Sequence, residues 1–71
     1  MKLKSDLINF INDNKNNIHN ADDLINQLEV EIKQHKYIKE VRVNILKIIS
    51  DYKQDYNWDF TLIDLNNYLF N

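Results

Sequence analysis

The sequence predicts an all-α fold, a compact bundle of three or four helices, from three observations. The 71 residues include neither Gly nor Pro, on which tight hairpin turns and loops of β proteins depend. Apolar residues recur at helical spacing in four segments. Asn is abundant, with twelve copies that can form helix ends and turns in place of Gly. A hydrophobic content of 44% also argues against disorder.

The length predicts a single small helical domain spanning residues 1–71. A chain of this size buries only about 60% of the surface that its unfolded form exposes, so its stability is marginal. It has no cysteine, which excludes disulfides and thiolate metal sites and is consistent with the cytoplasm. Formation of a homodimer would ease the shortage of core, so self-association is one expectation.

Two helices are expected in the first half of the chain. The first runs from Ser5 to about Lys15, with Ser5 as its N-cap and Asp6 in its first turn. The second begins after Asn20, an N-cap with Asp23 three residues later. Its apolar stripe comprises Ala21, Leu24, Ile25, Leu28 and Ile32.

The third segment has the strongest periodicity, and its relation to the second is open. Its broad apolar face comprises Ile38, Val41, Ile45, Ile48, Ile49 and Tyr52. A break between about Lys33 and Tyr37 is favoured, because Ile38 begins a new phase of the pattern. One long central helix over 21–54 is the alternative. A β-hairpin is a second alternative, because "LEVEI" (28–32) and "VRVNI" (41–45) both alternate between apolar and polar residues. It is weaker, because the segment that connects them lacks the usual turn residues.

A final helix is expected from Thr61 onwards. Thr61 would be its N-cap with Asp64 three residues later, and Phe60 would form a hydrophobic staple with Leu65. The similar hexapeptides "DLINFI", "DLINQL" and "DLNNYL" start at residues 6, 23 and 64. Their intervals are unequal, which indicates a common sequence pattern at helix starts rather than a structural repeat. The expected core comprises Leu7, Ile11, Leu24, Leu28, Ile38, Val41, Ile45, Ile48, Tyr52, Leu65 and Leu69.

Several functional classes are disfavoured by the composition. Phosphate-binding loops and nucleophile elbows need Gly, and neither His has a triad spacing, so we expect no enzyme, no catalytic residues and no cofactor. His19, Asp22 and Asp23 are too few for a structural metal site and are typical of a helix start. No apolar run approaches the roughly 18 residues of a membrane span, and the N-terminus becomes polar too soon for a signal peptide.

Nucleic-acid binding is the alternative function. Lys33, Lys36, Lys39 and Arg42 recur every third residue and could contact phosphates, or the third helix could act in a helix-turn-helix. The formal net charge of -2 argues against this, because nucleic-acid-binding domains are usually strongly basic. A solvated helix face is the favoured explanation of such a run.

The leading hypothesis is a small non-enzymatic regulator or inhibitor that binds a protein partner. Tyr56 and Trp58 lie among Asp51, Asp55 and Asp59, and aromatic residues with an acidic rim suit a basic partner surface. The alternative is that Tyr52 and Phe60 belong to the core and that Trp58 closes the loop end over it. The many Lys, Asn and Ile residues have AT-rich codons, which suggests a phage or mobile element of a low-GC bacterium. A structural homodimerisation module is the third hypothesis.

Overall fold

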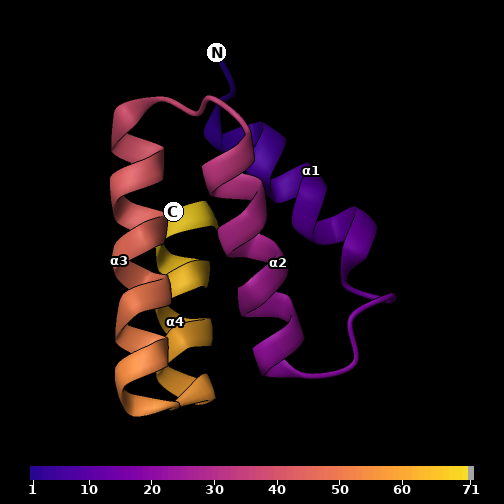
Figure 1. The fold of residues 1–71 in the computed structure, drawn as a ribbon, viewed down its shortest axis with the longest axis vertical. Coiled ribbons are helices and arrows are strands. Elements are labelled where there is room, and N and C mark those ends of the chain that lie inside the picture. The colour runs from indigo at the N-terminus through magenta and orange to yellow at the C-terminus, as the bar shows by residue number, and fades with distance from the viewer. Residues whose placement is uncertain (71) are drawn as a thin grey trace.

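Four helices and short connections make up residues 1–70, the part of the chain that the computed structural model describes (Figure 1). They are α1 (Lys4–Asn14), α2 (Ala21–Gln34), α3 (Lys39–Asp55) and α4 (Trp58–Phe70). The α3 helix packs against both α2 and α4 and runs antiparallel to them, while α1 lies diagonally beside α2, with Lys4 Nζ over the Tyr68 ring of α4 at 5.1 Å. The predicted all-α bundle is therefore confirmed, with α3 as its central helix.

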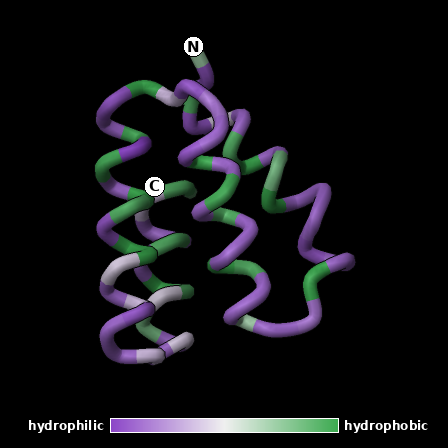
Figure 2. Tube along the Cα trace, in the orientation of Figure 1, coloured by the Kyte–Doolittle hydropathy of each residue, from purple (hydrophilic) through white to green (hydrophobic). Residues whose placement is uncertain are grey.

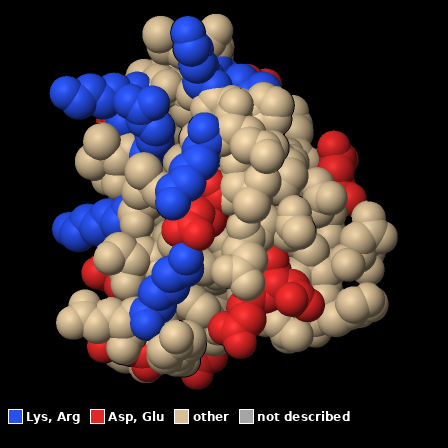
Figure 3. Space-filling view, in the orientation of Figure 1, with Lys and Arg blue, Asp and Glu red and all other residues tan. Residues whose placement is uncertain are grey.

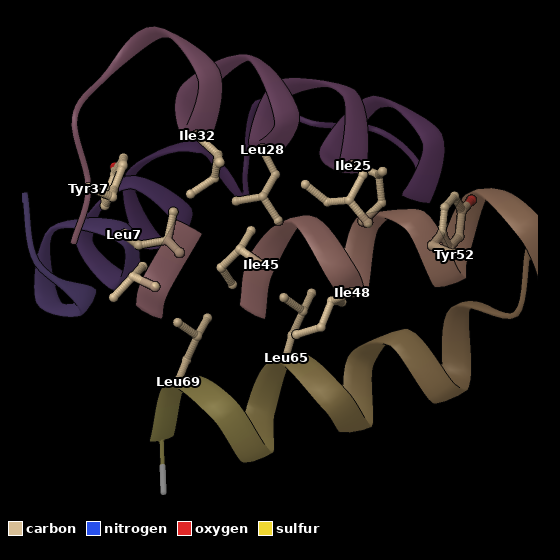
Figure 4. Close-up of a cluster of buried hydrophobic side chains, with 12 residues drawn as sticks. Leu7, Ile25, Leu28, Ile32, Tyr37, Ile45, Ile48, Tyr52, Leu65 and Leu69 are labelled. Carbon is tan, nitrogen blue, oxygen red and sulfur yellow. The ribbon is translucent and has the colours of Figure 1, made fainter. Parts of the chain in front are cut away.

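The core is formed by side chains from all four helices, which converge on one cluster (Figure 4). Figure 2 shows the cause, because hydrophobic positions recur along every helix between hydrophilic ones. Eight of the eleven predicted core residues are buried, and Ile11, Leu24 and Ile38 are half-buried at its edge. The further buried apolar residues are Ile25, Ile32, Tyr37 and Ile49.

The α2 helix begins as the sequence predicts, whereas the N-cap of α1 lies two residues earlier than predicted. The Asn20 side-chain oxygen accepts a hydrogen bond from the Asp23 backbone N–H at 2.9 Å, so Asn20 is the N-cap of α2. The prediction that Ser5 caps α1 is wrong, since Leu3 occupies the cap position. The Asp6 carboxylate accepts a hydrogen bond from the Leu3 N–H at 2.9 Å and satisfies this end of the helix instead.

The prediction that Thr61 caps the last helix is also wrong, because α4 begins at Trp58. The Asn57 side chain accepts from the Phe60 N–H at 3.2 Å, and the Thr61 hydroxyl donates to the Asn57 carbonyl at 3.0 Å. The helix start therefore lies at Asn57, and Thr61 is buried within the first turns. The expected staple between Phe60 and Leu65 does not form, since Phe60 points outward.

The favoured break between the second and third predicted helices is confirmed, and residues 35–38 form it. An isolated parallel bridge joins Lys2 to Tyr37, in which the Ile38 N–H donates to the Lys2 carbonyl at 2.9 Å. The N-terminal segment thus supplies hydrogen bonds that a continuous helix would have made internally. Both alternatives, one helix over 21–54 and a hairpin, are wrong.

Glu31, near the end of α2, contacts both the connection between α2 and α3 and the N-terminal segment. Its carboxylate accepts a hydrogen bond from the Tyr37 hydroxyl at 2.8 Å and lies 3.3 Å from Lys2 Nζ and 3.4 Å from His35 Nε2. Burial and this carboxylate raise the pKa of Tyr37, so the phenol stays protonated as a donor. A buried carboxylate is costly unless it is paired, and here three neighbours pair it.

Candidate functional site

The aromatic residues of the predicted partner site meet at the end of α3. The Tyr52 ring makes edge contacts with the rings of Tyr56 and Trp58, with centroid distances of 5.6 and 6.0 Å. Tyr56 ends the helix in the left-handed conformation at φ 53°, a position that Gly usually occupies. Its ring is therefore largely exposed, whereas Trp58 is half-buried against the core.

The predicted partner residues lie on different faces of the bundle. Tyr56 lines a hollow between α2 and α3, and Trp58 lines another beside the connection from α1 to α2. Asp51 and Asp55 line hollows on the opposite side of α3, where it meets α4. Asp59 is exposed on the first turn of α4. The structure therefore brings Asp51 and Asp55 together but separates them from the two aromatic residues.

Tyr52 is held by a partly buried hydrogen bond to α2. Its hydroxyl donates a hydrogen bond to the Asp22 carboxylate at 2.6 Å. This bond, together with burial, raises the pKa of Tyr52 to about 12, so the phenol is neutral at physiological pH. Tyr52 thus contributes to the association of α2 with α3 rather than to an open surface.

A groove follows the seam between α3 and α4, and we call it the α3–α4 groove. It consists of two adjoining hollows of about 310 and 380 Å³ that share Asp51 and Asp64. The lower hollow adds Asp55, Asn57, Phe60 and Thr61, and the upper one adds Asn44, Lys47, Ile48, Asn67 and Tyr68. Lys47 is the one cationic side chain among these lining residues.

Next to this groove, the outer face of α4 carries an apolar ridge, formed by Phe60, Ile63 and Phe70. Their exposed fractions are 65%, 52% and 60%. Spacings of three and seven residues place them on one side of a helix. That side is opposite to the buried Leu65 and Leu69.

Sequence reasoning missed this ridge because it assigned Phe60 to a staple. A signal for it exists, since "WDFTLID" is apolar on more than one side when placed on a helix. A short terminal helix can bury only one of these sides, so the second remains uncovered.

The carboxylates around the ridge are not neutralised. None of Asp51, Asp55, Asp59 and Asp64 forms an ion pair with a Lys, Arg or His of residues 1–70. By contrast, Glu29 pairs with Lys53 at 2.7 Å and with Lys33 at 3.7 Å. The hydrogen bond from Lys53, with both lysine charges, lowers the pKa of Glu29. The acidic side of α3 therefore faces α4, and the paired side faces α2.

The basic residues of the nucleic-acid alternative follow the connection between α2 and α3. Lys33 lies in the last turn of α2, Lys36 in the connection, and Lys39 and Arg42 at the start of α3. All four are exposed, and Figure 3 shows most Lys and Arg over the upper part of this face and most Asp and Glu below it. Because α2 and α3 run antiparallel side by side, they lack the 90–120° crossing of a helix-turn-helix.

Residues 1–70 contain neither a metal-binding cluster nor a membrane-spanning helix. No group of three or more His, Asp or Glu side chains there could hold a metal ion. None of the described helices is both long enough and apolar enough to cross a membrane. Comparisons with protein-family models, curated proteins and solved structures found no match to this chain.

Proposed function

We propose that this chain is a small non-enzymatic regulator or inhibitor that binds a protein partner through α4. The binding surface, which we call the α4 surface, comprises Phe60, Ile63 and Phe70 with the carboxylates of the α3–α4 groove. The protein would act in the cytoplasm of a low-GC bacterium and would be encoded by a phage or mobile element. The apolar contacts with the partner are therefore made by the ridge on α4 instead of Tyr56 and Trp58, while Asp51, Asp55 and Asp59 remain at the rim.

One observation supports this function above all: three large apolar side chains lie exposed on one face of one helix. Single exposed apolar residues are normal on protein surfaces, but aligned ones indicate an interaction site. Protein-binding surfaces typically have an apolar centre and a polar rim. The unpaired carboxylates beside Phe60 and Ile63 would form such a rim. A bound partner would cover the side of α4 that this chain leaves open.

The test is affinity capture from an extract of the source cells with two matched double variants. Phe60→Ser/Ile63→Ser removes the apolar centre of the α4 surface. Val30→Ser/Val43→Ser removes two apolar side chains of similar exposure, 44% and 53%, from α2 and α3. We expect the first variant to lose the captured protein and the second to retain it, with both keeping the wild-type far-UV circular dichroism spectrum.

Other outcomes would contradict the proposal in distinguishable ways. Equal capture by the two variants would show that the α4 surface is not the binding site. If the wild type captures no protein but shifts DNA or RNA in a gel at low salt, the nucleic-acid alternative would replace it. Loss of that shift on replacing Lys36, Lys39 and Arg42 with Ala would locate the nucleic-acid site. A stable homodimer that captures nothing would favour the dimerisation module.

A further inference from the structure

The charge around the apolar ridge is mainly negative, and Lys47 is the one cation among the residues that line the adjoining α3–α4 groove. Asp59 and Asp64 flank Phe60 and Ile63 along α4, and Asp51 and Asp55 lie across the groove on α3. The α4 helix contains no Lys, Arg or His. Lys53, the nearest basic residue in the sequence to Asp51 and Asp55, is committed to Glu29 at 2.7 Å. A partner that covers the ridge must therefore neutralise several carboxylates or leave them desolvated at a cost.

The form of the ridge indicates what kind of segment can cover it. Phe60 and Phe70, the ends of the ridge, are ten helical steps apart, which is about 15 Å at a rise of about 1.5 Å per residue. Strand addition requires an open sheet edge, and no strand occurs within residues 1–70. A helix with apolar residues at spacings of three, four and seven can pack along such a ridge, with its flanking residues over the adjoining groove.

From these observations we infer that the α4 surface receives a basic amphipathic helix of a partner protein. Its apolar face covers Phe60, Ile63 and Phe70, and its Lys or Arg side chains enter the α3–α4 groove opposite Asp51, Asp55 and Asp64. This inference rests on the proposed function and specifies the chemistry of the partner.

Charge complementarity decides between this occupant and a second copy of the chain. Two α4 helices that pack against each other about a two-fold axis would bring Asp59 and Asp64 of both copies close together. Like charges at such a contact oppose association. Anionic lipid surfaces and nucleic-acid phosphates would meet the same repulsion. A basic helix instead gains from every carboxylate at the rim, chiefly in its rate of association and its salt dependence.

The experiment uses the full chain and three synthetic helical peptides of about 20 residues, a length at which isolated helices form in water. The first has a Leu face flanked by Lys, the second has Glu in place of Lys, and the third has the composition of the first in scrambled order. Isothermal titration calorimetry measures the dissociation constants at low and high salt. We expect the Lys peptide to bind at least about tenfold more tightly than the Glu peptide, and to weaken at high salt.

Two matched variants locate the effect. Asp51→Asn/Asp64→Asn removes the two carboxylates that both hollows share, and Asp13→Asn/Asp23→Asn removes two exposed carboxylates from α1 and α2. The net charge changes equally in both. We expect the first variant to weaken binding of the Lys peptide by about fivefold to tenfold, and the second to leave it within about twofold.

Any of four results would overturn the inference. One is equal binding of the Lys and Glu peptides, and another is an equal effect of the two Asn variants. The third is a dimer, detected by sedimentation, that Phe60→Ser/Ile63→Ser converts to a monomer, because a second copy would then occupy the surface. If the natural partner is lost with Phe60→Ser/Ile63→Ser but kept with Asp51→Asn/Asp64→Asn, the proposed function stands and the basic helix is wrong.

Discussion

The two flanks of α3 differ in how their charged groups are satisfied. On the α2 flank, Lys53 pairs with Glu29, and the Tyr52 hydroxyl donates a hydrogen bond to the Asp22 carboxylate. On the α4 flank, Asp51 and Asp55 have no ionic partner within residues 1–70. The α2 flank thus has the features of an interface completed inside the chain. The α4 flank packs against α4 but leaves these carboxylates without an ionic partner within residues 1–70, which is the basis of the proposed binding surface.

The comparison teaches that exposure and charge pairing have to be considered together. Val43 on α3 is as exposed as Ile63 on α4, at 53% and 52%. Only Ile63 lies beside other exposed apolar residues and unpaired carboxylates. Exposure alone would therefore not distinguish a binding surface from an ordinary solvated helix.

The largest expected effect comes from the core that both flanks share. Ile45 on α3 is fully buried, and Ile45→Ala should lower the free energy of unfolding by about 3 kcal/mol, through lost burial and the cavity left behind. Urea denaturation measures this. The control, Val43→Ala on the exposed side of the same helix, should stay within about 0.5 kcal/mol of the wild type. Equal effects would contradict the position of the core.

A smaller effect tests the polar contacts next to the α2 flank. Tyr37→Phe removes the hydrogen bond to the buried Glu31 but keeps the ring, and should cost about 1.5 kcal/mol. Tyr56→Phe, on a ring with 67% exposure, serves as the control and should cost little. Thermal melting of both variants provides the measurement, and similar melting temperatures would show that Glu31 does not depend on this phenol.

The turn between the flanks offers a test of backbone strain. Tyr56 occupies the left-handed region at φ 53°, where a side chain is unfavourable and Gly is not. We expect Tyr56→Gly to be more stable than Tyr56→Ala by about 1 kcal/mol, the reverse of their usual order in a helix. Both variants lose the ring contact with Tyr52, so their difference in urea denaturation isolates the backbone term. A more stable Ala variant would contradict this conformation.

The smallest effect compares one carboxylate from each flank. Glu29→Gln should cost about 0.5 kcal/mol at neutral pH because it removes the pairs with Lys53 and Lys33. Asp51→Asn, on the unpaired flank, should cost nothing or stabilise the protein slightly. A cost for Asp51→Asn equal to that of Glu29→Gln would remove the distinction between the flanks.

The Glu29 contribution should also depend on pH. Because folding lowers the pKa of this carboxyl, its stabilisation is present above its ordinary value of 4.5 and is lost as pH falls through the lower folded value. Thermal melts of the wild type and Glu29→Gln should therefore converge below about pH 4.5. A gap that persists in acid would show that the ion pairs are not its cause.

Local signals predicted much of this fold from the sequence. The Asn20 cap, the break before Ile38 and most of the core depend on residues a few positions apart, which periodicity and capping rules describe. The predicted starts at Ser5 and Thr61 were wrong, because Asp6 and Asn57 provide competing local caps. The bridge from Lys2 to Tyr37 joins distant segments, so no local pattern could reveal it.

The candidate site was predictable only in part. The sequence identified acidic residues beside aromatic ones, and the structure places Asp51 and Asp55 together in the α3–α4 groove. It could not show that Tyr56 and Trp58 lie on other faces, because a helix end and a new helix start separate them from the acidic side of α3.

The sequence by itself determined that this protein is helical and that α3 forms the centre of the core, and it favoured a break after the second helix. Hydrophobic spacing and the lack of Gly and Pro are sufficient for this. Only the tertiary structure decided which side of α4 is covered. Its apolar residues occupy more than one side, and the side that becomes buried depends on where α3 and α2 lie in space. That choice leaves Phe60, Ile63 and Phe70 exposed beside unpaired carboxylates.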